Sequence, residues 1–147
     1  MIRSIEQKDR AVFIEMAREF YSTDAVERSI PHEYHERTFR ELMDSDVYAF
    51  CYMLEYNGAA AGYALMAKTF SQEAGGYVIW IDEVYVRPEF RSKGLFKEFF
   101  SYLKENIGGE TARIRLEVES DNVRAISLYE SLGFRKLDYG QMIIDLN

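Results

Sequence analysis

The feature that most constrains this chain is the stretch 84–100, VYVRPEFRSKGLFKEFF, where an extended run passes through a glycine loop into a strongly apolar helical pattern. The first N–H groups of a helix lack intrahelical partners, and the helix dipole adds positive potential at the same end. Arg91 and Lys93 bring two cations to this point in a chain whose net charge is −7. The stretch therefore predicts an anion-binding loop of the kind that holds a pyrophosphate.

Two common phosphate motifs are excluded at this loop. A Walker A sequence is absent because no GK[ST] occurs. The dinucleotide fingerprint needs three spaced glycines, whereas the loop contains only Gly94. Neither motif therefore accounts for this loop.

Hydrophobic periodicity predicts an α/β chain without linkers or repeats, so we expect a single domain over residues 1–147. Helices are expected over 9–21, 31–43, 95–107 and 122–132. Strands are expected over 1–5, 47–56, 60–70, 77–86 and 112–118, with two more short strands within 134–146. The pair Asn57-Gly58 predicts a tight hairpin turn, because both residues tolerate positive φ.

Composition narrows the class of protein further. The 147 residues are 48% hydrophobic and 29% charged, as in a globular domain. The single cysteine, Cys51, excludes an internal disulfide and lies in an apolar run, which favours a buried structural thiol. The negative net charge argues against nucleic-acid binding. No apolar segment has the length of a signal peptide or a membrane span, so we expect no membrane partner and a cytoplasmic protein.

Two motifs together resemble the GNAT (general N-acetyltransferase) superfamily. Residues 91–96, RSKGLF, occupy the frame R/Q-x-x-G-x-G/A, and DNVRAISLYESLGF follows with Asn122, Ala125, Tyr129 and Gly133-Phe134. The resemblance covers about residues 79–134. It implies a mixed, mostly antiparallel sheet of six to seven strands with splayed central strands, flanked by about four helices. Phe96 departs from the frame, and we expect its ring to point into the core beneath the helix.

The resemblance also implies acetyl-CoA as the acyl donor. The backbone of 84–86 would bind the pantetheine arm, and the loop 91–96 would bind the pyrophosphate. The residues assigned to the cofactor in this way are Val84, Tyr85, Val86, Arg91, Ser92, Lys93, Gly94, Leu95, Phe96, Asn122, Ala125 and Tyr129. Asn122 is also placed to cap the helix that follows it.

Acetyl transfer to an amine requires a base, because an amine with a pKa near 10 is only about 0.1% neutral at pH 7. A nearby carboxylate can take that proton, directly or through water. We expect Glu83 to be the base, with Asp82 as the second candidate. Each could instead face solvent or pair with Arg115. Successive strand side chains face opposite ways, so both can reach the acceptor only if a bulge intervenes, as is common in the family.

Tyr129 matches the family tyrosine that donates a hydrogen bond to the CoA sulfur. Its competing role is core packing beside Ala125 and Ile126 on one helical face. Since Cys51 lies outside both motifs, we expect direct attack of the amine on the thioester without an acyl-enzyme.

The expected acceptor is a primary amine of a small molecule, cationic or polyamine-like, or of a protein. Residues that could contact it are Tyr21, Asp24, Glu27, His32, Glu33, His35, Glu36, Tyr139, Gln141 and Met142. The acidic cluster within 33–41 could equally be a solvated helix face, and His32 and His35 are expected on the surface without a metal. The alternative function is a non-catalytic acetyl-CoA sensor. The apolar segment 139–146 could support a homodimer.

Overall fold

A computed structural model describes residues 1–24, 26 and 28–146 of the chain. These residues form two compact units, Met1–Leu116 and Glu117–Asn147. The first unit contains the sheet and most of the helices, and the second contains a helix and the carboxyl-terminal segment. That the whole chain acts as one domain stays a prediction.

The first unit is built on one mixed sheet with the strand order β1-β2-β3-β4-β5. The strands are β1 (Ile2–Ser4), β2 (Ala49–Tyr56), β3 (Ala59–Ser71), β4 (Gly76–Val86) and β5 (Thr111–Leu116). The helices are α1 (Arg10–Tyr21), α2 (His32–Asp44) and α3 (Leu95–Asn106) in the first unit and α4 (Val123–Ser131) in the second, with short 3-10 turns η1 (Gln7–Asp9) and η2 (Pro88–Phe90). Neighbouring strands are antiparallel except β4 and β5, which are parallel.

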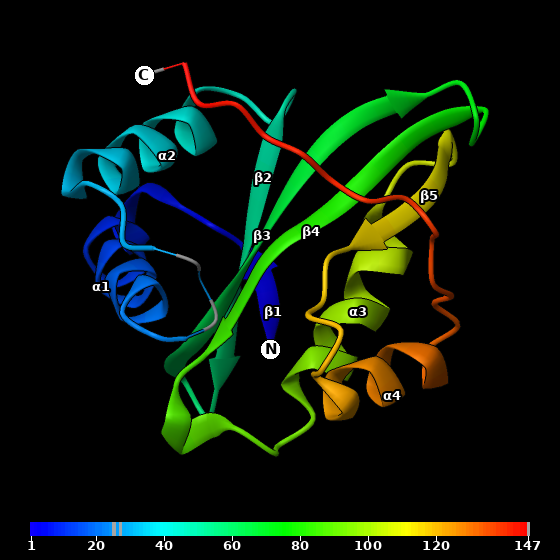
Figure 1. Cartoon of the computed structure of the whole chain (residues 1–147). Helices are drawn as coiled ribbons and strands as arrows, with labels where there is room; N and C mark the ends of the chain where they lie inside the picture. Colours follow the sequence, from blue (N-terminus) through cyan, green and yellow to red (C-terminus); the bar gives the residue numbers. More distant parts are fainter. Residues whose placement is uncertain (25, 27, 147) are drawn as a thin grey trace. The chain divides into compact units, whose positions relative to one another are not determined.

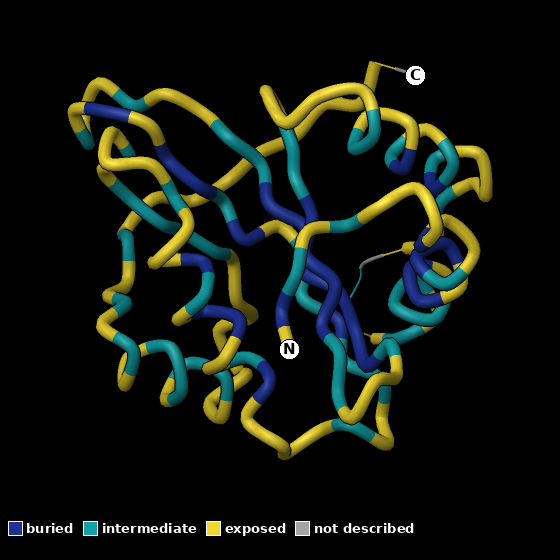
Figure 2. The backbone as a smooth tube through the Cα atoms, turned by 180° about the vertical axis from the view of Figure 1, so that it is seen from behind, coloured by how far each residue is buried: buried dark blue, intermediate teal, exposed yellow. Residues whose placement is uncertain are grey.

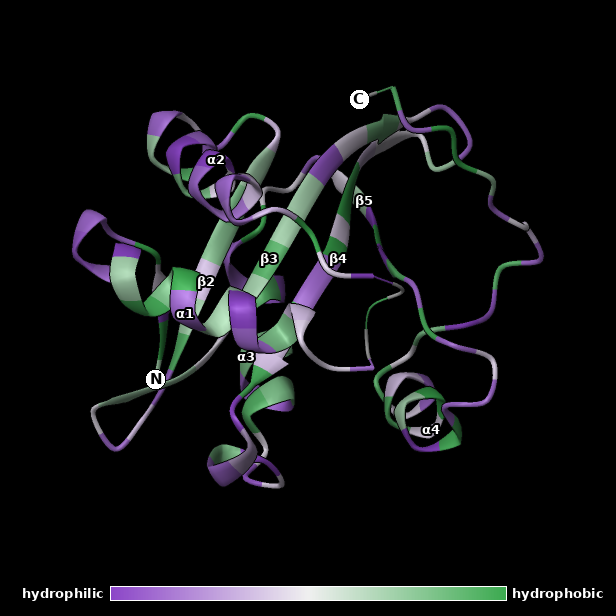
Figure 3. Ribbon diagram, turned by 60° about the vertical axis from the view of Figure 1, so that its left-hand side comes forward, coloured by the Kyte–Doolittle hydropathy of each residue, from purple (hydrophilic) through white to green (hydrophobic). Residues whose placement is uncertain are grey.

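Helices cover both faces of this sheet, with α1 and α2 on one face and α3 on the other (Figure 1). On the first face, the ring of Phe13 packs against Phe39 of α2 and Tyr63 of β3. On the second face, Tyr52 of β2 contacts Phe99 of α3. The middle strands are accordingly the most buried part of the backbone (Figure 2), and β2 and β3 are mostly apolar (Figure 3). The two cores lie on opposite sides of one sheet.

The predicted elements agree with the structure except at the carboxyl-terminal end. The sheet has five strands, so the prediction of six to seven is wrong. The two strands expected within 134–146 are absent, because the described part of the second unit holds α4 and no strand. An extended segment becomes a strand only when another strand accepts its backbone hydrogen bonds. Local apolar pattern alone could not supply that partner.

A bulge in β4 changes the direction of its side chains at Asp82. Leu65 of β3 lies opposite Glu83, whereas the next residue, Met66, lies opposite Ile81, so Asp82 is the additional residue. Directly opposed residues of an antiparallel pair share a face of the sheet. Leu65 belongs to the core under α1 and α2, and Met66 points the other way. The bulge therefore places Glu83 on the α1 and α2 face, although Ile81, two residues earlier, points to the α3 face.

The strands β4 and β5 separate just beyond this bulge. Their parallel pairing ends at Ile81 and Leu116, whereas β4 continues to Val86. Figure 1 shows the two strands diverging at this point. The edge of β4 over residues 82–86 that points away from β3 is therefore not paired with β5. Apart from the Val86 carbonyl oxygen, which accepts a hydrogen bond from Arg91, its backbone groups can take other partners.

Candidate active site

The predicted anion loop leads from β4 through η2 into α3. Gly94 is the N-cap of α3 with φ 78°, and no side chain caps this end among the described residues. Ser92, two residues earlier, also has positive φ, at 61°. The first N–H groups of α3 thus meet a loop whose backbone is turned by two left-handed residues. This is the arrangement that binds an anion through main-chain donors.

The side chains of the loop place positive charge at its opening and an aromatic ring against α3. Arg91 and Lys93 are exposed, and Arg91 Nε donates to the carbonyl oxygen of Val86 at 2.9 Å, which ties the loop to the end of β4. Phe96 is partly buried, with its ring stacked near Phe100 and edge-on to Phe99. Its side chain therefore packs against the apolar residues of α3, as the sequence predicts.

Glu83 is held by two tyrosine hydroxyl groups. Tyr21 donates to Oε1 at 2.5 Å, and Tyr63 donates to Oε2 at 2.8 Å. Burial raises the pKa of Glu83 above its ordinary value, and Asp82 adds to this, while the two hydrogen bonds act in the opposite direction. A carboxylate with a raised pKa is a better proton acceptor near neutral pH.

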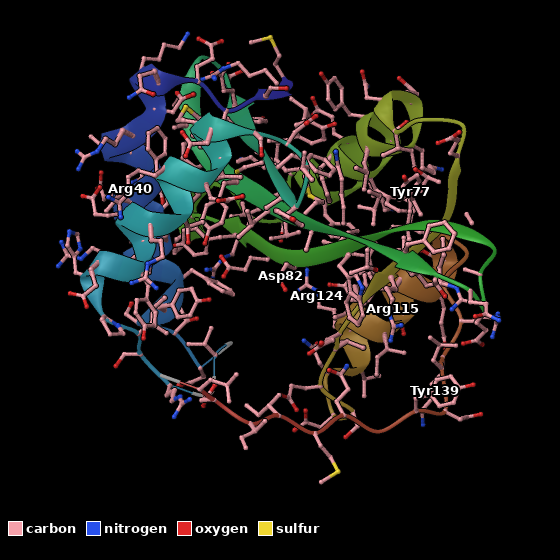
Figure 4. The ribbon with its side chains drawn as sticks, turned by 90° about the horizontal axis from the view of Figure 1, so that it is seen from above. Arg40, Tyr77, Asp82, Arg115, Arg124 and Tyr139 are labelled. Carbon is pink, nitrogen blue, oxygen red and sulfur yellow. The ribbon has the colours of Figure 1, made fainter. Side chains whose placement is uncertain are left out.

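Arg115, named above as a possible partner of these carboxylates, makes a cation–π contact with Trp80. Its guanidinium lies 3.8 Å from the centre of the Trp80 ring. Asp82 is exposed on β4 and lines a shallow pocket together with Arg37, Thr38 and Glu41 of α2. Figure 4 shows Asp82 near the middle of β4, well separated from Tyr77 at the start of that strand. Both carboxylates thus face the α2 side of the sheet, as the bulge allows.

Sequence reasoning missed Tyr63 and placed Tyr21 only among the residues that could contact the acceptor. Tyr63 lies opposite Tyr85 in the register, which makes it a diagonal neighbour of Glu83. The available signal was a single hydroxyl in the buried run 61–66, because a buried phenol requires a hydrogen-bond partner. The partner itself depends on the bulge, which no local pattern reveals.

A second carboxylate holds the carboxyl-terminal half of α1 against the end of β4. Glu19 accepts a hydrogen bond from the Tyr85 hydroxyl at 2.8 Å and pairs with Arg87 at 3.0 Å. Arg87 also pairs with Glu15 one turn earlier. Burial, together with Glu19, raises the pKa of Tyr85 to about 12, so this hydroxyl remains a donor. The contact fixes the turn of α1 that carries Tyr21.

The strands β3 and β4 lie very close together at Gly62 and Tyr85. A Cβ atom on Gly62 would lie 2.0 Å from the carbonyl oxygen of Tyr85. Only glycine leaves room for that carbonyl group at this register position.

In the second unit, several residues of the motif around Tyr129 form the two ends of α4. Asn122 Oδ1 accepts the Ala125 N–H at 3.2 Å, which confirms the predicted cap. Gly133 has φ 98°, and the Phe134 N–H donates to the carbonyl oxygen of Tyr129 at 3.0 Å. The rings of Tyr129 and Phe134 pack together at 5.9 Å. These features form a Schellman motif with its usual apolar contact, and burial raises the pKa of Tyr129.

Other predicted residues fall in different environments. His35 is only 5% exposed and packs against the ring of Tyr21, so its expected surface position is wrong. The reason is helical spacing, since His35 and Phe39 share the buried face of α2. His32 is exposed, and Cys51 is buried as predicted. Glu27 lies outside the described residues.

The described residues contain no group of three or more His, Cys, Asp or Glu side chains that could hold a metal ion. None of the described helices combines the length and apolarity needed to cross a bilayer.

Comparisons with known proteins agree with this geometry. The spermine/spermidine N(1)-acetyltransferase of Bacillus subtilis (strain 168) is 26% identical over 86 residues, which cover 56% of this chain and 57% of that protein. The match thus spans little more than half the length of this curated relative. A possible acetyltransferase from Clostridium difficile 630 has a similar fold, with a TM-score of 0.83 at 22% identity over 100% of this chain and 97% of that one.

A second solved structure is the aminoglycoside N-acetyltransferase AAC(6')-Iy with the bisubstrate analogue CoA-S-monomethyl-acetylneamine. It has a TM-score of 0.81 at 14% identity, covering 99% of this chain and 97% of that one. The model of the acetyltransferase (GNAT) family matches residues 12–134. With the anion loop before α3 and the bulged fourth strand, this match shows that the chain belongs to the GNAT acetyltransferase family.

Proposed function

We propose that this protein is an acetyl-CoA-dependent N-acetyltransferase that transfers the acetyl group directly to a primary amine of a small, cationic acceptor. The observation that carries the proposal is Glu83. This partly buried carboxylate has a raised pKa and is turned by the bulge toward the α2 side, where β4 leaves its pairing with β5. A base in that position can remove the proton that an amine acceptor carries at neutral pH.

The loop supplies the features that a CoA pyrophosphate requires. The N–H groups at the start of α3 are not capped by a side chain, and Arg91 and Lys93 add positive charge in a chain with a net charge of −7. On the unpaired edge of β4, the backbone groups of Val84 and the N–H of Val86 are offered to the pantetheine arm, whereas the Tyr85 carbonyl group faces β3. Acetyl-CoA supplies the activated thioester when it is bound.

Within this chain, Glu83 accepts the proton that the ammonium group must lose, directly or through one water molecule. Its two hydroxyl partners occupy one lone pair on each oxygen and leave the others for the acceptor. Cys51 is buried and its pKa is raised by burial, which argues against a thiolate acyl carrier. Tyr129 remains the proposed donor to the developing thiolate, through a hydrogen bond rather than full proton transfer.

A slight excess of negative charge in the pocket on the α2 side supports a cationic acceptor. The carboxylates of Asp82 and Glu41 and the guanidinium of Arg37 line the shallow pocket on the α2 side, which also contains Leu65, the residue opposite Glu83. The curated relative is named for spermine and spermidine, and AAC(6')-Iy for an aminoglycoside, all of which carry several amino groups. We therefore infer a polyamine-like acceptor, with protein amino groups as a second class to be tested.

The direct test is release of CoA thiol from acetyl-CoA with a panel of polyamines, aminoglycosides, amino acids and peptides. Each product is identified by its mass. We expect turnover with polyamines and a loss of at least a hundredfold in the Glu83→Gln variant. Glu105→Gln, which removes an exposed carboxylate on α3, serves as the matched control and should keep wild-type rates.

Two results would contradict the proposal. Binding of acetyl-CoA without turnover of any amine would favour the sensor alternative. Turnover that Glu83→Gln leaves unchanged would remove Glu83 from the role of base.

We also infer a homodimer, because Met142, Ile143 and Ile144 are exposed in the second unit. Sedimentation velocity tests this at micromolar concentration. A monomer at every concentration would contradict it. The cytoplasmic location stays a prediction.

A further inference from the structure

Glu83 receives its two hydrogen bonds from parts of the first unit that are far apart in the sequence. Tyr63 lies in the middle of β3, and Tyr21 is the last residue of α1. Each hydroxyl group binds a different carboxylate oxygen, at 2.8 Å and 2.5 Å. The carboxylate is therefore held from two sides.

Tyr63 is a rigid donor. Its side chain is fully buried, and its ring meets Phe13 at 5.2 Å and Tyr85 at 6.2 Å. The strand β3 lies between β2 and β4 and pairs with both. Its hydroxyl group can thus move very little relative to Glu83.

Tyr21 is fixed from a different direction. Its ring packs edge-on against Phe20 at 5.3 Å and against His35 of α2 at 5.5 Å. Two residues earlier, Glu19 anchors the same helical turn to Tyr85 and Arg87 at the end of β4. The position of the Tyr21 hydroxyl group is therefore set by α1, α2 and β4 together.

We propose that Tyr63 and Tyr21 are positioning residues for Glu83, whose hydroxyl groups hold the two carboxylate oxygens so that the side chain stays ionised and aims its remaining lone pairs at the acceptor amine. This inference rests on the proposed function. It assigns the two tyrosines no contact with the acetyl donor and no proton transfer of their own.

The electrostatics of the three groups support this assignment. Burial raises the pKa of Glu83, whereas both tyrosine hydrogen bonds lower it. Burial and Glu83 also raise the pKa of each tyrosine, so both hydroxyl groups keep their protons and remain donors. Removing either hydroxyl group leaves Glu83 buried but takes away one hydrogen bond that lowers its pKa. The pKa of Glu83 therefore rises, and a larger fraction of it is protonated at neutral pH.

The first test compares the pH–rate profiles of Tyr63→Phe and Tyr21→Phe with wild type. We expect kcat at pH 7 to fall about tenfold in each variant, with little change in the KM for the amine. The loss should shrink as the pH rises, because Glu83 ionises again. Tyr52→Phe is the matched control, since it removes a buried hydroxyl group on the α3 face and should follow the wild-type profile.

A second readout does not depend on turnover. The carboxyl carbon of Glu83 is followed by 13C NMR in protein labelled at glutamate, and the signal is assigned by its absence in Glu83→Gln. We expect its titration midpoint to move to higher pH in both phenylalanine variants and to stay in place in Tyr52→Phe.

An unchanged midpoint in both variants, or a kcat loss equal at every pH, would overturn the positioning role. If Tyr63→Phe fails to fold, Tyr21→Phe decides the question alone, because its ring is only partly buried. A shifted midpoint in a protein that acetylates no amine would support the positioning role and reject the proposed function.

Discussion

At the scale of the single residue, Glu83 combines two conflicting requirements. Burial suits its carboxylate to the proposed role of base, but it also makes the ionised side chain unfavourable in the folded state. Active sites commonly keep such groups at the expense of stability. The two tyrosine hydroxyl groups reduce this cost without removing it.

Replacing Glu83 by glutamine should therefore separate activity from stability. The folded state binds the Glu83 proton more tightly than the unfolded state, so the contribution of Glu83 to stability falls as the pH rises from the ordinary pKa of 4.5 through the higher value in the fold. At pH 7, Glu83→Gln should lack activity yet resist urea better than wild type. The difference should vanish below about pH 4.5. A variant that is less stable than wild type at pH 7 would contradict this expectation.

Ser92 is a second residue whose conformation lowers the stability of the folded protein, and a substitution can measure this effect. Its φ of 61° lies in the left-handed region, which disfavours a side chain by about 1 kcal/mol. Ser92→Gly should raise the free energy of unfolding by about that amount in urea denaturation. Ser101→Gly, in the middle of α3, should lower it by a similar amount. Equal signs for the two variants would show that the loop backbone relaxes around Ser92.

At the scale of the element, the site depends on how β3 and β4 meet. Gly62 lets the Tyr85 carbonyl group approach, and the bulge at Asp82 turns Glu83 toward the tyrosines. Both features are set by pairing between strands rather than by either strand alone.

Gly62→Ala should therefore disturb the fold and the site together. The new Cβ would overlap the Tyr85 carbonyl oxygen, so β3 and β4 must separate. We expect the free energy of unfolding to fall by about 3 kcal/mol and the activity to drop with it. Gly108→Ala is the control, because a Cβ there meets nothing within 4 Å and φ is not positive. Wild-type stability in Gly62→Ala would show that the two strands can shift freely.

Local sequence patterns predicted most of the helices, strands and turns. They could not predict contacts that depend on how the strands pair. Asn57 and Gly58 both have positive φ, as a tight hairpin requires, and Gly94 begins α3 as the loop pattern indicated. The contact between Tyr63 and Glu83 could not be predicted, because it depends on a one-residue change of register. The buried position of His35 follows from α1 packing on α2, which the polar sequence of α2 conceals.

At the scale of the whole molecule, charge is distributed unevenly. The chain carries a net charge of −7, but the mouth of the anion loop presents Arg91 and Lys93. A negatively charged cofactor and a positively charged acceptor would therefore be attracted to different parts of the surface.

Binding of acetyl-CoA should stabilise the folded protein measurably. At a ligand concentration about a hundred times Kd, the gain is about 2.7 kcal/mol and appears as a higher melting temperature. Lys93→Ala should weaken binding by about fivefold in calorimetry, and added salt should reduce that difference. Lys104→Ala, at the opposite end of α3, should bind like wild type. Equal losses in both variants would point to a general charge effect rather than to the loop.

The additional residue in β4 has a consequence for how this sequence can vary. In a regular strand every second side chain lies on the same face. The face required of a side chain at one end therefore fixes the faces of the side chains at the other end. The shift of phase at Asp82 divides β4 into two independent halves. The half before the bulge follows the needs of the core, while the half after it combines one core residue, Tyr85, with the proposed chemistry of Glu83. Selection on substrate preference can therefore alter one without reshaping the other.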